Sequence, residues 1–160
     1  MGELPGLLLP SFMDNLLRQV VPIRERGVFT APIAGDLKSP TCCTGDIAAA
    51  AARWLLDDSW SGVGTAAVLG PEDLSFNEIA AVMSEVLARP VRFEQIPGQA
   101  LKDRLLGFGS TEAMAQATVD MMEAKNQGLD SAELRTPESS SPTSFRQWCE
   151  EVLKPAVLAG

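Results

Sequence analysis

The sequence of 160 residues contains no histidine and no tyrosine, and these two absences exclude several kinds of active site. Without histidine, the chain cannot form a Ser-His-Asp or Cys-His catalytic arrangement. Without tyrosine, it cannot contain a Tyr-x-x-x-Lys pair, in which the phenol acts as a general acid. We therefore assign no catalytic residue from the sequence.

Cysteine is scarce as well, with Cys42, Cys43 and Cys149 as the three examples and no Cys-x-x-Cys spacing among them. Since histidine is absent, a zinc site would need all three thiolates and a carboxylate. We expect no metal site. The better interpretation is three buried free thiols in a reducing compartment.

Long hydrophobic runs and clustered positive charges are also missing. No apolar run is long enough to cross a bilayer, and Leu7–Leu9 lacks the basic flank of a signal peptide. A net charge of −8, from 13 basic and 21 acidic residues, argues against binding to nucleic acid. We expect a cytoplasmic protein that binds neither membranes nor nucleic acid.

The rest of the composition is that of a globular protein, with 46% hydrophobic and 21% charged residues. A chain of this length can bury a core of its own. We expect residues 1–160 to form a single domain, with a polar loop at 130–142 and Trp60 as a packed anchor in another loop.

The clearest secondary-structure pattern runs from Thr65 to Pro97. A short apolar strand, Thr65–Leu69, precedes a capping box formed by Ser75 and Glu78. Apolar residues at helical spacing follow, and the alternating segment Val91–Gln95 indicates an edge strand. A single helix between two strands predicts a crossover unit in one parallel sheet.

Similar patterns predict the remaining elements and favour an α/β fold. Leu7–Leu9 is apolar on both faces, which is typical of a buried parallel strand. Further strands are expected at 27–33 and 41–44, and further helices at 12–22, 47–56, 99–106, 112–127 and 145–155, with Pro22 and Pro155 ending or kinking two of them.

Helix caps can be predicted for most of these helices. Ser11 is expected to cap the first, and Thr44 or Asp46 the second. Ser110 or Thr111 is expected to cap the helix at 112–127, and Gly128 to end it. The last helix begins with Ser144 and Gln147, a second capping-box pattern.

The turn after the first strand is a candidate ligand site, because ligands of open α/β sheets gather at the carboxyl ends of strands. Ser11, Phe12 and Asn15 would face such a crevice. The simpler alternative is that Ser11 caps a helix, Phe12 packs and Asn15 fixes a loop. The residues alone favour this alternative.

Two other patterns are weaker. Gly62-Val63-Gly64 precedes a strand, whereas a nucleotide-binding glycine turn follows a strand and opens a helix. The methionine-bearing helix at 112–127 would suit a flexible substrate lid or a subunit contact. Core packing is favoured over both.

The order of these segments resembles the C-terminal half of NmrA-like proteins, which are atypical short-chain dehydrogenase/reductase relatives that use or sense NAD(P). The resemblance covers about Leu7 to Leu153. It rests on PSFMDNLL, on the Gly-Val-Phe strand, on GDIAAAAARWLLD and on LGPEDLSFNEIAAVMSEVLARPVRFEQIP.

The resemblance implies roles for the residues of the first turn. Pro10, Ser11 and Phe12 match positions beside the nicotinamide end of the cofactor NAD(P). Phe12, Met13 and Asn15 match positions that line the substrate pocket. The family also implies a structural role for the segment Asp46-Ile47-Ala48.

The sequence departs from the family in one large respect, because the glycine-rich nucleotide loop of the N-terminal half is absent. We therefore expect an α/β fold with a partial Rossmann-like sheet and a substrate-side helical lobe, with the nucleotide-binding half missing. This predicts a truncated member. The open strand edge at Leu7–Leu9 would pair with a second copy or with a separately encoded N-terminal half.

The function implied by the resemblance is that of an NAD(P)H-dependent oxidoreductase acting on small quinone or carbonyl-type substrates. We expect the chain alone to show no turnover and weak or absent NAD(P) binding. The alternatives are a non-catalytic redox-sensing regulator and a protein-interaction module of the same family.

Overall fold

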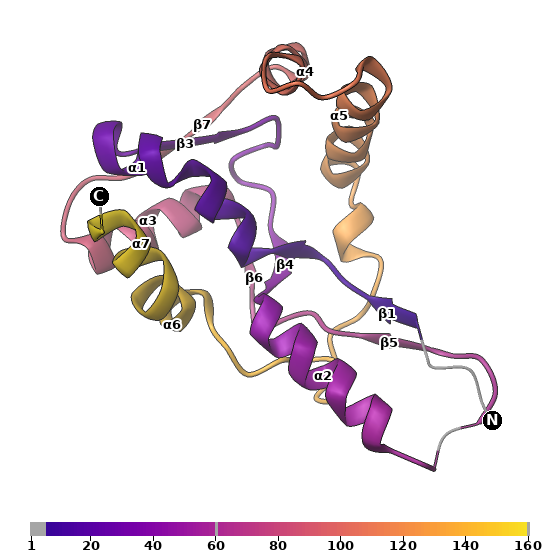
Figure 1. The fold of residues 1–160 in the computed structure, drawn as a ribbon. Coiled ribbons are helices and arrows are strands. Elements are labelled where there is room, and N and C mark those ends of the chain that lie inside the picture. Colours follow the sequence, from indigo (N-terminus) through magenta and orange to yellow (C-terminus); the bar gives the residue numbers. More distant parts are fainter. Residues whose placement is uncertain (1–5, 60, 160) are drawn as a thin grey trace.

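The computed structural model describes residues 6–59 and 61–159, so the predicted anchor Trp60 lies outside the described residues. Short strands alternate with helices in an α/β arrangement (Figure 1). In chain order the elements are β1 (Gly6–Leu8), β2 (Ser11–Phe12), the 3-10 helix η1 (Met13–Gln19), α1 (Val20–Arg26), β3 (Val28–Ala31), β4 (Ser39–Cys42), α2 (Thr44–Leu56), β5 (Thr65–Ala67), β6 (Asp73–Leu74), α3 (Phe76–Leu87), β7 (Arg92–Gln95), α4 (Gly98–Gly107), α5 (Glu112–Asn126), the 3-10 helix η2 (Leu129–Ser131), α6 (Phe145–Trp148), the π turn η3 (Cys149–Leu153) and α7 (Lys154–Leu158).

The described strands form three small sheets. β1 is parallel to β5, and β3 is parallel to β7. β4 lies between β2, to which it is parallel, and β6, to which it is antiparallel. The predicted crossover is wrong, because β5 and β7 pair with different strands. Between β5 and α3 lies a strand that was not predicted, β6. It pairs with β4, so the chain leaves the sheet that contains β5 before α3 begins.

β1 is less buried than its apolar sequence predicts. Leu7 and Leu8 are half-buried, and Leu9 is 37% exposed. The expectation of burial on both faces is therefore wrong. Within the described part of the chain, β5 is the single strand paired with β1, so the other edge of β1 carries no strand.

The hydrophobic core lies around α3 and the C-terminal helices, away from β1 and β5. α3 buries Ile79, Ala80, Met83 and Val86, which recur at helical spacing on one face. They pack with buried residues of η1, α1, β3 and the last helix, which include Met13, Ile23, Phe29, Phe145, Trp148 and Leu153.

The capping box of α3 is confirmed. Ser75 Oγ accepts from the amide of Glu78, and the Glu78 carboxylate accepts from the amide of Ser75. Thr111 also caps α5 as predicted, by accepting from the amide of Met114. The box expected at Ser144 is half-formed, because the side chain of Gln147 bonds Glu151 instead.

The two prolines expected to end or kink helices lie inside helical segments. Pro22 occupies the first turn of α1. N–H groups in a first turn have no carbonyl partner within the helix, so the N–H that proline lacks costs no helical hydrogen bond. Before Pro155 the helix widens into the π turn at Cys149–Leu153 and then continues as α7. A π turn accommodates the carbonyl that a proline cannot bond.

α4 and α5 form a helical hairpin at the end of the molecule opposite α2 (Figure 1). Ala115 is the one residue of α5 in the buried class. Met114 is 63% exposed and Met121 is 43% exposed, so the expected core packing of these methionines is wrong. Their sequence spacing suited a buried face, but in the folded chain both side chains are exposed. Among the described helices, none is both long and apolar enough to span a bilayer.

Candidate functional site

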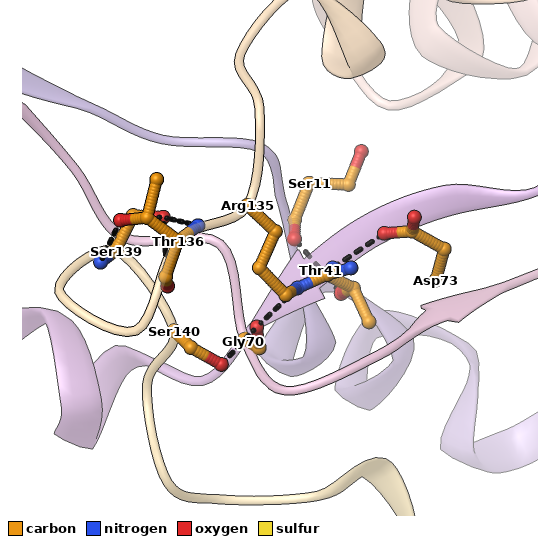
Figure 2. Close-up of polar contacts among 8 residues, drawn as sticks. All are labelled: Ser11, Thr41, Gly70, Asp73, Arg135, Thr136, Ser139 and Ser140. Atoms are coloured by element: carbon orange, nitrogen blue, oxygen red, sulfur yellow. Dashed lines mark hydrogen bonds and ion pairs between the residues drawn. The ribbon is translucent and has the colours of Figure 1, made fainter.

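The turn after β1 brings the predicted cofactor residues to the carboxyl end of a parallel strand. Pro10 is buried, and Ser11–Phe12 form β2, which pairs with Thr41 and Cys42 of β4. Thr41 Oγ1 donates to the main-chain oxygen of Ser11 at 2.8 Å, a contact drawn in Figure 2. The strand pairing holds the turn in an extended conformation.

Ser11 does not cap a helix, so that expectation is wrong. The residue before η1 is Phe12, and no side chain caps η1. Because β2 pairs with β4, the Ser11 hydroxyl is free to bond residues far along the chain. It donates to Asp130 Oδ2 at 3.0 Å and accepts from Lys125 Nζ, also at 3.0 Å.

Lys125 and Asp130 form a close ion pair beside this hydroxyl. Lys125 Nζ lies 2.6 Å from Asp130 Oδ2, and the two side chains are 14% and 9% exposed. Charges this well buried are tolerated when they are paired and hydrogen-bonded, as both are here. Ser11, Lys125 and Asp130, which we call the Ser11 cluster, thus join the strand end to α5 and η2.

The next residue of α5 fixes the helix to a second strand end. Asn126 Oδ1 accepts from the amide of Ala34, and Asn126 Nδ2 donates to the oxygen of Pro32, both at 2.9 Å. Both partners follow β3. The last turn of α5 is therefore tied to the carboxyl ends of β1 and β3.

The remaining residues of the turn lie in different environments. Met13 is fully buried in the core, Phe12 is half-buried and Asn15 is exposed. The three side chains therefore differ widely in their exposure to solvent. The substrate-pocket role of Phe12, Met13 and Asn15, and the cofactor role of Pro10, Ser11 and Phe12, remain predictions.

Asp14 in the same turn positions α2. Its carboxylate accepts from the amide of Thr44 at 2.9 Å and from Thr44 Oγ1 at 3.0 Å. The predicted caps Thr44 and Asp46 are wrong, because Cys43 precedes the helix and Asp46 instead accepts from Thr143. A carboxylate at a helix N-terminus also complements the helix dipole.

Two cavities lie near this region. One, of about 450 Å³, lies between α2, β5 and the loop at 136–142, and we call it the alanine cavity after Ala49, Ala50, Ala66 and Ala67 in its walls. The other, of about 250 Å³, lies at the start of α2 beside Trp148. Asp46 lines both. Over residues 6–59 and 61–159, none of the predicted site residues Pro10–Met13 and Asn15 lines either cavity.

The three cysteines are free and buried, as predicted. Burial raises the pKa of the Cys42 thiol to about 12, with a further contribution from Cys43. Burial likewise raises the pKa of Cys149 to about 11, with Glu150 adding to the shift. Thiols with such pKa values are poor nucleophiles at neutral pH. In the described part of the chain, no three His, Cys, Asp or Glu side chains gather as metal ligands would.

Sequence reasoning missed Lys125, Asp130 and Asp14. The sequence did contain a signal for Lys125, because this lysine shares with Met114 and Met121 a helix face that was expected to be buried. A buried charge needs a partner. Asp14 carries no local signal, because its partner Thr44 lies 30 residues away. Asp130 lies five residues from Lys125, but its contact with Ser11 spans 119 residues and could not be foreseen.

The sequence model of the NmrA-like family matches residues 4–148, which is most of the chain. This protein belongs to the NmrA-like family. The predicted resemblance to this family is thereby confirmed.

Curated relatives of this NmrA-like protein include two reductases. An NAD(P)H azoreductase of Xenophilus azovorans is 37% identical over 106 residues, covering 66% of this chain and 36% of the relative. A (4-alkanoyl-5-oxo-2,5-dihydrofuran-3-yl)methyl phosphate reductase of Streptomyces griseus is 31% identical over 146 residues, covering 88% and 50%. The chain thus spans half or less of the length of these relatives.

Solved structures show the same fold. The triphenylmethane reductase of Citrobacter sp., complexed with NADP(H), has a TM-score of 0.66 at 19% identity, and the match covers 93% of this chain and 50% of the reductase. An NADPH-dependent quinone oxidoreductase of Escherichia coli, complexed with NADPH, has a TM-score of 0.65 at 20% identity, covering 87% and 50%. The predicted α/β fold is therefore confirmed for this chain, and it is similar to about half of each of these two reductase structures.

Proposed function

We propose that this chain forms the substrate-side part of an NAD(P)H-dependent oxidoreductase that acts on small quinone or carbonyl-type molecules. The observation that supports it best is the Ser11 cluster. It fixes α5 and η2 beside the carboxyl end of β1, the end of a parallel strand at which ligands of α/β proteins bind. The reductases among the relatives support the reaction class.

The cofactor would meet this chain at its nicotinamide end. Pro10, Ser11 and Phe12 would hold that end, with Phe12, Met13 and Asn15 toward the substrate. The polar Ser11 cluster suits the carboxamide of nicotinamide, but the described strand-to-helix turns offer no glycine-rich cradle for the pyrophosphate. Bound NAD(P)H supplies the hydride, and the protein positions both reactants.

We place the nucleotide-binding part against the free edge of β1. A parallel strand normally has covered faces and paired neighbours, and among the described strands β1 has β5 on one side. The completing part would be carried by a longer native form of this chain or by a separate polypeptide. A second copy of the chain is the remaining way to occupy the edge.

The test compares the 160-residue chain with the native protein isolated from its source, whose intact mass is measured first. We expect no steady NADPH consumption with a quinone acceptor by the chain alone. We expect consumption when a nucleotide-binding part is present. Steady turnover by the purified chain alone would contradict the division proposed here, and failure of the completed protein to bind NADPH would contradict the function.

A further inference from the structure

One side of α2 carries an apolar stripe that is open to solvent. Ala48, Ala51, Ala52 and Leu55 recur at spacings of three and four residues, so they lie on one face of the helix. Ala48 and Ala52 are exposed, Ala51 is half-buried and Leu55 is 63% exposed. We call these four residues the α2 stripe. A helix of a globular protein normally buries such a stripe and turns its charged residues to solvent.

The charged residues of α2 lie on the other side of the helix. Asp46 and Arg53 line the alanine cavity together with Ala49 and Ala50, and this side faces β5. In the described chain no residue of α2 is buried. A helix of 13 residues is only marginally stable without packing against other elements. Both the pattern and the length of α2 therefore indicate that the α2 stripe is a contact surface.

The strand pairing indicates what covers this surface. β1 and β5 are parallel neighbours, and α2 is the last element of the connection between them (Figure 1). Connections between neighbouring parallel strands usually contain a helix and are nearly always right-handed. Two right-handed connections that step across a sheet in the same direction place their helices on the same face. A parallel strand on the open edge of β1, leading into β1, would therefore bring its connecting helix to the side of α2.

We propose that the α2 stripe binds an amphipathic helix of the nucleotide-binding part, namely the helix that leads into β1. The inference rests on the proposed function, which places that part on the open edge of β1, and it adds a second contact on the face of the sheet. The chain spans half or less of the two curated reductases, and the remainder of such proteins is long enough for a strand and a helix. Three alanines in the stripe allow the helix axes to approach to about 8 Å, and Leu55 adds apolar area.

Thiol labelling tests the proposal, because the three native cysteines are buried. Leu55→Cys is introduced into the 160-residue chain and into the native protein expressed in its source, and both are treated with the thiol reagent DTNB at low protein concentration. We expect the new thiol to react about tenfold or more slowly in the native protein, since a packed thiol reacts only when its contact opens. Leu134→Cys, which replaces a leucine that is 85% exposed in the loop after η2, should react equally in both.

The other outcomes of this experiment separate the proposal from its rivals. Equal rates at position 55 would overturn it, including the case in which the native protein is the 160-residue chain alone. Protection that disappears on dilution would identify a second copy as the occupant and would also overturn it. NADPH binding by the native protein without protection at position 55 would keep the proposed function and reject the docked helix. Protection without NADPH binding would do the reverse.

A charge placed on the stripe gives a second readout. Ala52→Lys should lower the urea midpoint of the native protein by about 0.5–1 M, because the ammonium group would be buried between two helices. In the 160-residue chain the midpoint should change little, since position 52 is exposed and lysine is a good helix former. Ala117→Lys, at an exposed alanine of α5, should leave both midpoints nearly unchanged. Equal shifts for Ala52→Lys in the two proteins would overturn the proposal.

Discussion

Gly70 is the residue on which several contacts converge. Its φ is +74°, and a Cβ there would lie 2.0 Å from the oxygen of Thr41. Its own oxygen accepts from Arg135 Nε and Ser140 Oγ. The turn after β5 therefore passes close against β4 while it holds the loop at 136–142 in place, and a side chain at this position would disturb both.

Gly70→Ala should be strongly destabilising, because the added methyl meets main-chain atoms that cannot move aside. We expect a loss of more than about 3 kcal/mol in the free energy of unfolding, measured by urea denaturation. Gly109→Ala is the matched control: its φ is +88° but its Cβ would meet no atom within 4 Å. It should cost about 1–2 kcal/mol from the left-handed backbone alone. Equal losses in the two variants would show that the close approach to Thr41 is unimportant.

Glu78 gives the α3 capping box a pH dependence. Hydrogen bonding and attraction from Lys38, together with the amide of Ser75, hold the pKa of Glu78 below its ordinary value of 4.5. A lowered pKa in the folded state stabilises the protein above pH 4.5, and this stabilisation is lost as the pH falls through the lower value.

Glu78→Gln keeps the capping-box geometry but removes the charge. We expect the urea midpoints of this variant and the parent protein to differ most near neutral pH and to converge as the pH falls through the lowered pKa of Glu78. Glu133→Gln, in an exposed loop, should show no such convergence. A difference that stays constant down to low pH would contradict the role of the Glu78 charge.

At the scale of elements, the last turn of α5 is the anchor of the α4–α5 hairpin. Lys125 bonds Ser11 and Asp130, and Asn126 bonds both Pro32 and Ala34. The rest of α5 is largely exposed. The position of the hairpin relative to the strand ends is thus set by two adjacent side chains.

Lys125→Met should loosen this anchor, because it leaves the Asp130 carboxylate poorly solvated and without its cation. We expect a loss of about 1–3 kcal/mol and faster amide exchange at residues 122–126. Lys102→Met is the control, since its partner Glu112 is 70% exposed and such pairs contribute under about 1 kcal/mol. A Lys125→Met/Asp130→Asn double variant should recover part of the loss. Equal costs for the two lysines would argue against the anchor.

Local signals predicted the helices well, and the contacts between distant segments escaped prediction. The capping box at Ser75 and the cap at Thr111 depend on residues within one turn, so the sequence specifies them. Asp14 caps α2 from 30 residues away, and Asp130 binds Ser11 from 119 residues away. Such pairs depend on the folded arrangement. The candidate turn lies after an apolar strand, as expected, and its role stays a prediction, but its distant partners were not foreseen.

At the scale of the whole molecule, one end exposes much apolar surface. α2 has no residue in the buried class, although it is rich in alanine and ends in Leu55 and Leu56, which are 63% and 84% exposed. The unpaired edge of β1 lies in the same part of the structure (Figure 1). Exposed apolar surface beside an open strand edge favours association.

We expect the 160-residue chain to self-associate as its concentration rises and to bind an apolar dye, measured by light scattering and fluorescence. Leu55→Glu should reduce both effects. Leu134→Glu, which changes a leucine that is 85% exposed in the loop after η2, should change them little. A clean monomer that binds no dye would contradict this expectation.

The pairing of the strands also has a consequence for how the chain folds. Gly6 pairs with Thr65, and Val28 pairs with Arg92, so each of these parallel pairs must first close a long loop. Loop closure of this kind slows folding, whereas α3 and α5 form from neighbouring residues. Until the loops close, β1 and β3 have not yet paired with β5 and β7. During this time a strand from another molecule can pair with the open edges of β1 and β3. Refolding should therefore be slow for a chain of this length, and its yield should fall as the protein concentration increases.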